Sequence, residues 1–261
     1  MTNGASIRQR ALITGASAGI GEGFARHLAK RGYDLVLVAR RRERLDALAA
    51  ELSSVSSDVI EADLCQAEGL ATVEERLRAG DIDLLVNNAG FGTFGEFAKL
   101  PIEREMEELD LNVRALMRLS HAALGPMIEH GRGGIINVAS MAAYQPIPYN
   151  ATYSATKVFV MHFSEALHEE TKQHGVSVTC VCPGPVHTEF QQVAGLESER
   201  IPAIAWTSVD TVVETALTAL RNRHAIATPG AFNMLTGAGA RMTPHFITRR
   251  IAGAMFRDRG A

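Results

Sequence analysis

The sequence predicts an α/β protein, a single doubly wound domain over residues 1–261 with a seven-stranded parallel sheet and helices on both of its faces. Two observations lead to this prediction. Seven short apolar runs recur along the 261-residue chain, and stretches with helical periodicity separate them. Runs that are apolar throughout are typical of parallel strands buried on both faces. In such a sheet we expect the ligand crevice at the carboxyl ends of the strands.

Gly, Asn, Asp or Pro bounds each of the apolar runs, and these residues interrupt regular structure. We expect strands at residues 11–14, 34–39, 58–62, 83–86, 134–138, 176–181 and 225–227. We expect helices at residues 20–30, 43–52, 67–79, 102–130, 151–174 and 208–222. Two stretches break the alternation. They are a long connection at residues 185–207, interpreted as a substrate lid, and the tail after Pro229.

Composition excludes several classes of protein. A hydrophobic content of 46% with 21% charged residues is that of a soluble globular chain, and a net charge of −3 gives no reason to expect a nucleic-acid partner. The polar residues 1–10 lack a signal-peptide core, and no apolar run is long enough to span a membrane, so we expect the cytoplasm. No metal-ligand spacing appears. Cys180 and Cys182 share one face of a predicted strand, which indicates buried residues rather than a redox or metal pair.

A glycine-rich turn, Gly15-x-x-x-Gly19-x-Gly21, follows the first predicted strand and opens the first helix. Unpaired backbone N–H groups and the helix dipole at such a place attract phosphate oxygens, and glycines allow their close approach. The turn therefore indicates a dinucleotide site. The alternative is a glycine-rich turn without a ligand.

The end of the second predicted strand favours NADP over NAD. Ala39 stands where an acidic residue would bind the 2′-hydroxyl of NAD, and Arg40 follows it. A guanidinium there could grip a 2′-phosphate with charge-assisted hydrogen bonds. The alternative is a solvated basic helix start, which we expect for Arg42 and Arg44, with Arg41 intermediate between the two roles.

Asp63-Leu64 ends the third predicted strand, where the carboxylate could accept a hydrogen bond from an adenine amino group. Capping of the next helix is an equally good interpretation of Asp63.

Tyr153 and Lys157 are four residues apart on one predicted helix, so their side chains can meet. A phenol with an ordinary pKa is a poor proton donor and acceptor at neutral pH, and a fixed cation beside it favours its anionic form. This spacing predicts that Tyr153 acts as a general acid and base.

Further motifs fall at the ends of the later strands. Asn87-Asn88-Ala89-Gly90 ends the fourth, Ser140 the fifth and Pro183-Gly184 the sixth. Together with the glycine turn, Asn112 and the Tyr153-Lys157 pair, they resemble the short-chain dehydrogenase/reductase family over residues 11–187. Within that family, residues 87–97 and 182–190 resemble bacterial DltE-type oxidoreductases.

The resemblance implies a Rossmann-type fold and an NAD(P)-dependent, metal-free hydride transfer between a carbonyl and an alcohol. Tyr153 would move the proton, Lys157 would lower the pKa of Tyr153 and hold the nicotinamide ribose, and Ser140 would hydrogen-bond the substrate oxygen. Asn112 would hold a water that connects Lys157 to solvent. Without the resemblance, Asn112 could equally be an exposed or backbone-bonded residue.

The resemblance also assigns residues to the cofactor, which we expect to be NADP(H) in preference to NAD(H). The expected contacts are Gly15, Ser17, Gly19, Ile20, Gly21, Arg40, Arg41, Asp63, Leu64, Asn88, Ala89, Gly90, Tyr153, Lys157, Pro183, Gly184, Val186 and Thr188.

Residues 91–97, 141–150 and 185–206 should line the mouth above Tyr153. Among them are Phe94, Met141, Tyr144, Phe190 and Trp206, which favour an apolar or aromatic carbonyl substrate. The alternative is that they cover the core or an interface.

The tail at residues 241–261 carries five Arg and one Asp, with apolar residues near helical spacing. We expect a basic amphipathic helix packed on its own domain, ahead of membrane contact or a subunit interface. The resemblance implies a homodimer or homotetramer built partly on the helix at 151–174. A non-catalytic NADP-binding regulator on the same fold is the rival function, and its usual mark would be loss of the Tyr or the Lys.

Overall fold

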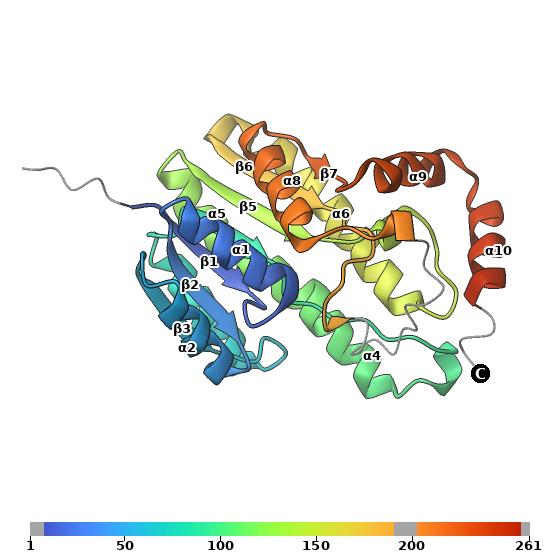
Figure 1. Cartoon of the computed structure of the whole chain (residues 1–261), viewed down its shortest axis with the longest axis horizontal. Coiled ribbons are helices and arrows are strands. Elements are labelled where there is room, and N and C mark those ends of the chain that lie inside the picture. The colour runs from blue at the N-terminus through green and yellow to red at the C-terminus, as the bar shows by residue number, and fades with distance from the viewer. Residues whose placement is uncertain (1–7, 191–202, 257–261) are drawn as a thin grey trace, which may run out of the picture.

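The chain folds around a parallel sheet, seen here in a computed structural model that describes residues 8–190 and 203–256 (Figure 1). The seven strands lie in the order β3-β2-β1-β4-β5-β6-β7 and all pair in parallel. They are β1 (Arg10–Thr14), β2 (Asp34–Ala39), β3 (Ser57–Glu61), β4 (Leu84–Asn87), β5 (Gly133–Val138), β6 (Val176–Val181) and β7 (Ile226–Ala227). The predicted sheet is confirmed.

Helices cover both faces of this sheet. Those described are α1 (Gly19–Lys30), α2 (Arg42–Glu51), α3 (Ala67–Arg78), α4 (Ile102–Leu109), α5 (Leu116–Glu129), α6 (Ala151–Thr171), α8 (Val209–Arg221), α9 (Ala231–Met242) and α10 (His245–Phe256). One face carries α1, α2 and α8, and the other carries α3, α5 and α6. The last two helices, α9 and α10, lie beyond the β7 edge rather than on the sheet (Figure 1).

The strands are apolar along their length because each side of the sheet faces a core. On β1, Leu12 enters the core beneath α3 and α5, whereas its neighbour Ile13 enters the core beneath α1 and α8. Both side chains are completely buried. Cys180 and Cys182 are buried as expected, with their sulfur atoms 3.8 Å apart.

The helix expected at 102–130 is continuous but not uniform. Between α4 and α5 the chain widens into a π-helical segment, Asp110–Ala115, which contains Asn112. Such a one-turn widening leaves the apolar pattern of the flanking helices nearly unchanged, so the sequence does not reveal it. π-Helical turns occur often at functional sites.

The single helix expected in the tail from residue 241 is wrong in its bounds. The backbone at Thr243 is extended, and Pro244 follows it. Since the residue before a proline disfavours the helical conformation, α9 ends at Met242 and α10 begins at His245. Residues 257–261 of the predicted helix lie outside the described residues.

Two further observations bear on the expected organisation. Residues 191–202 of the expected lid lie outside the described part, while its flanks are joined by a bridge between Val186 and Thr207. Among the residues the structure describes, no helix is both long enough and apolar enough to cross a membrane.

The strand order reverses at β1, which has β2 on one side and β4 on the other. Connections after β1 and β4 leave on opposite faces, so a crevice opens at the carboxyl ends of these strands. Asn88 links the ends of β4 and β1 at this crevice, because its side-chain amide donates to the carbonyl of Thr14 at 2.9 Å. The Thr14 hydroxyl in turn accepts hydrogen bonds from the backbone N–H groups of Asn88 and Ala89, each at 3.0 Å.

Candidate functional site

A cavity of about 1090 Å³ lies along the carboxyl ends of the strands. It brings together residues that are distant in sequence and that the sequence assigned to one site. The predicted site residues that line it are Gly15, Ser17, Gly19, Ile20, Arg40, Arg41, Asp63, Leu64, Asn88, Ala89, Gly90, Ser140, Tyr153, Lys157, Pro183, Gly184, Val186 and Thr188. Gly21 and Asn112 lie behind the wall rather than on it.

The glycine turn at one end of the cavity requires glycine for steric reasons. Gly15 and Gly19 have φ angles of +67° and +58°, in the left-handed region that other residues rarely adopt. At Gly21, a Cβ atom would lie 2.3 Å from the Gly15 carbonyl oxygen. Helix α1 starts directly behind the turn, and its N-cap residue, Ala18, makes no side-chain hydrogen bond to the first N–H groups. These groups are therefore free to bind a phosphate.

Three basic side chains lie near the end of β2. Arg41 donates to the hydroxyl of Ser17 in the glycine turn, at 3.2 and 3.1 Å, and pairs with Glu189 at 2.8 Å. Arg44 also pairs with Glu189, at 2.6 Å. Arg40 lines the cavity, is exposed, and makes no hydrogen bond or ion pair with any other described residue. Its guanidinium is available to an anionic ligand.

Asp63 does not cap the next helix, so that interpretation is wrong. The residue before α3 is Gln66, and no side chain caps this helix. The Asp63 carboxylate instead accepts a hydrogen bond at 3.0 Å from the backbone N–H of Cys65, two residues on. This local turn holds Asp63 and Leu64 against the cavity.

Tyr153 and Lys157 lie one turn apart near the start of α6, and both face the cavity. The Lys157 ammonium nitrogen is 5.5 Å from the centre of the Tyr153 ring and donates to the Val138 carbonyl at 3.0 Å. Ser140 follows β5 and lies close enough to the Tyr153 side chain to lower its pKa. One proton donor, one cation and one further hydroxyl thus meet at a single point.

Burial dominates the electrostatics of this cluster. It raises the pKa of Tyr153 above its ordinary value, against the opposing effect of the Ser140 hydrogen bond, while the negative charge of Glu108 raises it further. Burial also lowers the pKa of Lys157 to about 8, partly offset by nearby groups including Glu108. At neutral pH the phenol is therefore protonated and holds a proton to give.

Two glycines let the backbone approach the cluster. A Cβ atom on Gly92 would lie 2.8 Å from the Tyr153 ring, and one on Gly90 would lie 2.9 Å from the amide oxygen of Asn112. The Phe190 ring packs beside Tyr153, with 5.5 Å between centroids. Gly92 lies in the predicted mouth segment 91–97, but no motif marks it as the residue beside Tyr153.

Asn112 is buried in the π-helical segment and ties three elements together. Its amide nitrogen donates to the Phe91 carbonyl at 2.8 Å and to the Thr156 hydroxyl at 3.1 Å. Its amide oxygen accepts from the Phe91 N–H at 3.2 Å. Asn112 thus holds the chain after β4 against α6, and its interpretation as an exposed residue is excluded.

The sequence missed a pair of buried carboxylates on α4. Glu108 is completely buried and Glu105 nearly so, and each has one oxygen without a hydrogen-bond partner among the described residues. The other Glu108 oxygen accepts from the N–H and the hydroxyl of Thr93, both at 2.9 Å. Burial raises the pKa of Glu108 to about 7, and the charge of Glu105 also raises it. Nothing in the acidic run at 103–108 shows which of its carboxylates are buried.

The residues that line the mouth of the cavity agree in part with the prediction. Phe94, Met141, Tyr144 and Phe190 line it, but Trp206 does not and instead stacks on His187 at 3.8 Å between centroids. The helices after β7 supply further lining residues that the sequence did not suggest: Phe232, Asn233, Thr236, Gly237, Ala240, Ile251 and Ala252.

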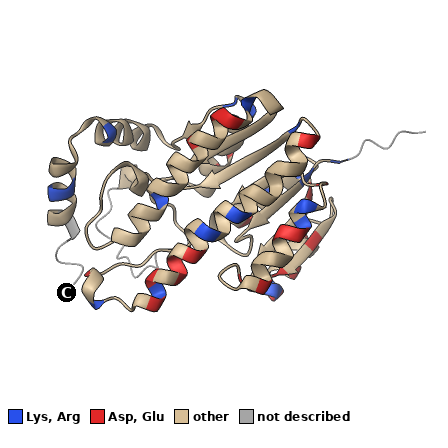
Figure 2. Cartoon of the chain, turned by 180° about the vertical axis from the view of Figure 1, so that it is seen from behind, with Lys and Arg blue, Asp and Glu red and all other residues tan. Residues whose placement is uncertain are grey.

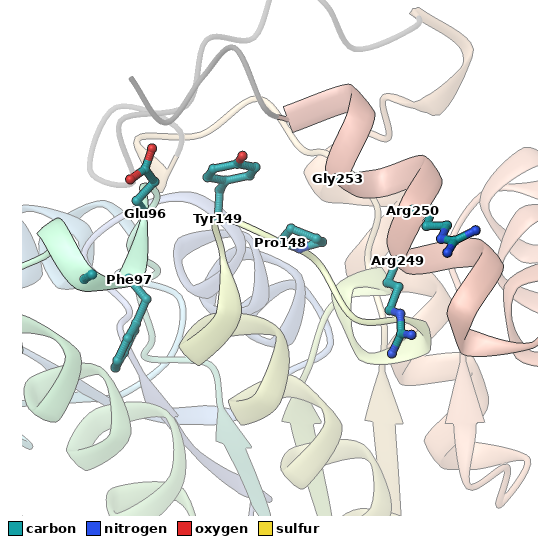
Figure 3. Close-up of a pocket in the computed structure, with 8 residues that line it drawn as sticks. Glu96, Phe97, Pro148, Tyr149, Arg249, Arg250 and Gly253 are labelled. Carbon is teal, nitrogen blue, oxygen red and sulfur yellow. The ribbon is translucent and has the colours of Figure 1, made fainter.

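A second, more open groove of about 760 Å³ lies outside the mouth. Figure 3 shows Glu96 and Tyr149 on one side of it and Arg249 and Arg250 on α10 at the other. It contains none of the predicted catalytic or cofactor residues, but Glu96, Phe97, Pro148 and Tyr149 belong to segments predicted to line the mouth.

Comparison with known proteins shows the family to which the chain belongs. A family model described as short chain dehydrogenase matches residues 9–199. An uncharacterized oxidoreductase of Myxococcus xanthus is 39% identical over 187 residues, which are 69% of this chain and 73% of that protein. A very-long-chain 3-oxoacyl-CoA reductase of Anas platyrhynchos is 35% identical over 195 residues, which cover 70% of this chain but only 62% of the reductase.

Solved structures show the same fold. A short-chain dehydrogenase from Sphingobium yanoikuyae, in complex with NADPH, matches with a TM-score of 0.81 and 38% identity, covering 88% of this chain and 93% of that one. An alcohol dehydrogenase from Comamonas testosteroni, described as specific for bulky-bulky ketones, matches with a TM-score of 0.78 and 34% identity, covering 90% and 93%. The chain belongs to the short-chain dehydrogenase/reductase family, and it is an oxidoreductase of the nicotinamide-dependent class.

The described residues fit a nicotinamide dinucleotide. Gly15 and Gly21 allow the turn to pack tightly against the end of β4, and α1 begins there with N–H groups that its N-cap residue does not cap, which suits a pyrophosphate. The cavity continues without interruption from this turn to Tyr153.

Proposed function

We propose that the protein is an NADP-preferring oxidoreductase that interconverts a carbonyl compound and its secondary alcohol. One observation carries the proposal: Tyr153, Ser140 and Lys157 meet at one end of the cavity whose other end holds the glycine turn and Arg40. Arg40 and Arg41 would hold the 2′-phosphate, and the absence of a carboxylate at Ala39 removes the usual partner of the NAD ribose.

Residues of the chain itself would transfer the proton. In the direction of reduction, the protonated Tyr153 hydroxyl donates its proton to the carbonyl oxygen as negative charge develops there. Ser140 hydrogen-bonds the same oxygen and fixes it beside Tyr153. When bound, the nicotinamide ring supplies or accepts the hydride.

Lys157 would keep positive charge beside the phenol. With a pKa of about 8 it is mostly protonated at neutral pH, so it stabilises the Tyr153 phenolate once the proton has left. Asn112 would support a water between Lys157 and solvent, through which the proton is replaced.

An apolar, bulky carbonyl compound is the proposed substrate class. Phe91, Phe94, Met141 and Phe190 line the mouth, and Ile251 of α10 adds to them. The Comamonas relative is described as specific for bulky ketones, and the duck relative is a reductase of very-long-chain 3-oxoacyl-CoA. Both descriptions support a substrate with large apolar groups around the carbonyl.

The remaining features of the proposal concern the chain as a whole. We retain one domain over residues 1–261, a substrate lid at 185–207 and a cytoplasmic location. A homodimer or homotetramer built partly on α6 agrees with exposed apolar residues on the neighbouring helices α4 and α5: Ile102, Met106, Leu109, Met117 and Ile128.

NADPH consumption tests this proposal, measured over a panel of ketones, aldehydes, quinones and oxoacyl thioesters. The wild-type protein should turn over bulky apolar members, and Tyr153→Phe should lose about 10²- to 10⁴-fold in kcat, the usual contribution of general acid–base catalysis. Tyr33→Phe, on a phenol packed against the core near α1, is the matched control and should keep full activity.

Equal turnover by Tyr153→Phe and the wild-type protein would overturn the mechanism. Tight NADPH binding without oxidation of NADPH by any carbonyl compound in the panel would favour a regulatory NADP-binding protein. Activity confined to small, highly charged carbonyl compounds would contradict the proposed substrate class.

A further inference from the structure

Helices α9 and α10 carry many large apolar side chains that are exposed to solvent. Leu235 is 73% exposed, Met242 87%, Phe246 54% and Ile251 58%. Phe232, Met234 and Ile247 on the same two helices are also exposed. Exposed apolar side chains gathered on neighbouring helices often mark an interaction site.

These helices touch the rest of the chain along two narrow lines of residues. On α9 the buried positions are Asn233 and Gly237, and on α10 they are Thr248 and Ala252. A Cβ atom on Gly237 would lie 2.7 Å from the Tyr144 ring, so the small residue allows a close but thin contact. Both helices lie at the β7 edge of the molecule, away from the centre of the sheet, as Figure 1 shows.

The charged residues of α9 and α10 are all basic. Residues 225–256 contain no Asp or Glu. Figure 2 accordingly shows basic but no acidic residues on α9 and α10. Arg241 pairs with Glu165 of α6 at 3.7 Å, whereas Arg249 and Arg250 are exposed and make no ion pair with any other described residue.

The two arginines of α10 lie between apolar residues on both sides, Phe246 and Ile247 before them and Ile251 after them. Phe246 and Arg250 are four residues apart and share one side of the helix, and Ile247 and Ile251 share the adjacent side. A helix with exposed apolar residues and arginines but no carboxylates has the composition of one that lies in the surface of an anionic bilayer. Lipid phosphates can pair with the arginines while the apolar side chains enter the acyl boundary.

A second copy of the chain is a poorer occupant. A symmetric contact places the same patch on both sides, so it would bring the Arg249 and Arg250 of each copy toward those of the other without any carboxylate of this region between them. We propose that α9 and α10 dock the protein peripherally on an anionic lipid surface.

The docking surface adjoins the mouth of the cavity. Phe232 of α9 and Ile251 of α10 line the cavity while remaining partly exposed. Docking would therefore place the cavity mouth at the lipid surface, where apolar compounds concentrate.

Flotation of the full-length protein with vesicles tests the proposal without any need for turnover. One set of vesicles contains phosphatidylcholine and phosphatidylglycerol in equal parts, and the other contains phosphatidylcholine alone. The protein should float with the first set and not with the second, and added salt should release it because screening weakens the attraction.

Two variants separate the electrostatic contribution to docking from the apolar contribution. Arg249→Gln with Arg250→Gln should lower the partition coefficient about 25-fold, since each arginine near an anionic surface contributes about a factor of five. Leu235→Ser, Met242→Ser and Phe246→Ser together should abolish flotation. The matched control carries Leu235→Met, Met242→Leu and Phe246→Leu, which keep these exposed positions apolar, and should float as the wild-type protein does.

NADPH binding by each variant confirms that it is folded. A wild-type protein that stays at the bottom of the gradient with anionic vesicles overturns the proposal, as does equal flotation with both sets of vesicles. A dimer that dissociates in the Leu235→Ser, Met242→Ser and Phe246→Ser variant, from a protein that does not float, would show that a second copy covers this surface.

Discussion

Glu108 accepts two hydrogen bonds from Thr93, so a fully buried carboxylate on α4 holds the loop that passes over the Tyr153 ring. The same carboxylate acts electrostatically on Tyr153 and Lys157. Its ionisation therefore bears on both the stability of the fold and the groups proposed to move the proton.

Glu108→Gln should make the free energy of unfolding less dependent on pH. The pKa of Glu108 is about 7 in the folded protein, above the ordinary 4.5, so the folded state keeps a proton that the unfolded state releases between these values. Wild-type stability falls as pH rises through this window, and the Gln variant lacks that loss. Its unfolding free energy relative to wild type should rise by up to about 3 kcal/mol from about pH 4.5 to about pH 8.

Urea unfolding at several pH values measures this difference. Glu103→Gln removes an exposed carboxylate of the same helix and should leave the pH dependence unchanged. A Glu108→Gln variant with the same pH profile as wild type would show that Glu108 is already ionised in the folded protein.

Ser140→Ala should lower kcat by about 10²- to 10³-fold, the usual effect of removing one hydrogen-bond donor to a developing oxyanion. The Ser140 hydrogen bond also lowers the pKa of Tyr153, so its loss should move the rise of alcohol oxidation to higher pH. Steady-state pH profiles in both directions measure these effects. Ser154→Ala, which removes a hydroxyl that bonds only the α6 backbone among described residues, should change neither. A normal kcat in the Ser140 variant would remove Ser140 from the mechanism.

Arg40→Ala should weaken NADPH binding about 10- to 100-fold, the range for a lost charge-assisted hydrogen bond, and leave NADH binding unchanged. Fluorescence titration with each cofactor measures both dissociation constants. Arg42→Ala is the control, because Arg42 is exposed and pairs with Asp46 on its own helix. Equal losses for the two cofactors would mean that Arg40 does not contact the 2′-phosphate.

Glu189→Gln should strengthen NADPH binding. The Glu189 carboxylate occupies Arg41 and Arg44, and removing its charge frees both guanidinium groups for a phosphate. An exposed ion pair is worth up to about 1 kcal/mol, so the NADPH dissociation constant should fall by up to about fivefold, with no change for NADH. Glu43→Gln, nearby on α2, is the control. Weaker NADPH binding in the Glu189 variant would show that this residue orients Arg41 for the cofactor.

The sequence predicts most of the fold because the strands are apolar on both faces and their ends carry distinctive residues. All seven strands lie within about one residue of their predicted bounds. The π-helical turn around Asn112 could not be predicted, because its widening depends on the hydrogen bonds that Asn112 makes with Phe91 and Thr156. The end of α9 could have been predicted from Pro244 alone.

The candidate site, like the fold, could be predicted from the sequence only in part. Backbone motifs such as Gly15 to Gly21 have local causes, so they can be read from the chain, and the cavity contains nearly all the residues they indicated. Glu108, Gly92 and the lining residues of α9 have no local signature, since their roles depend on which distant side chain faces them. The finer similarity to DltE-type oxidoreductases and the roles of the individual site residues stay predictions.

Gly237 gives α9 its close approach to Tyr144, and through it the two terminal helices form one wall of the cavity while contributing none of the proton-transfer groups. The groups proposed to transfer the proton and the residues proposed to select the substrate thus lie in separable parts of one chain. Residues on α9 and α10 can diverge between relatives, changing which molecules enter, while the arrangement around Tyr153 is left as it stands.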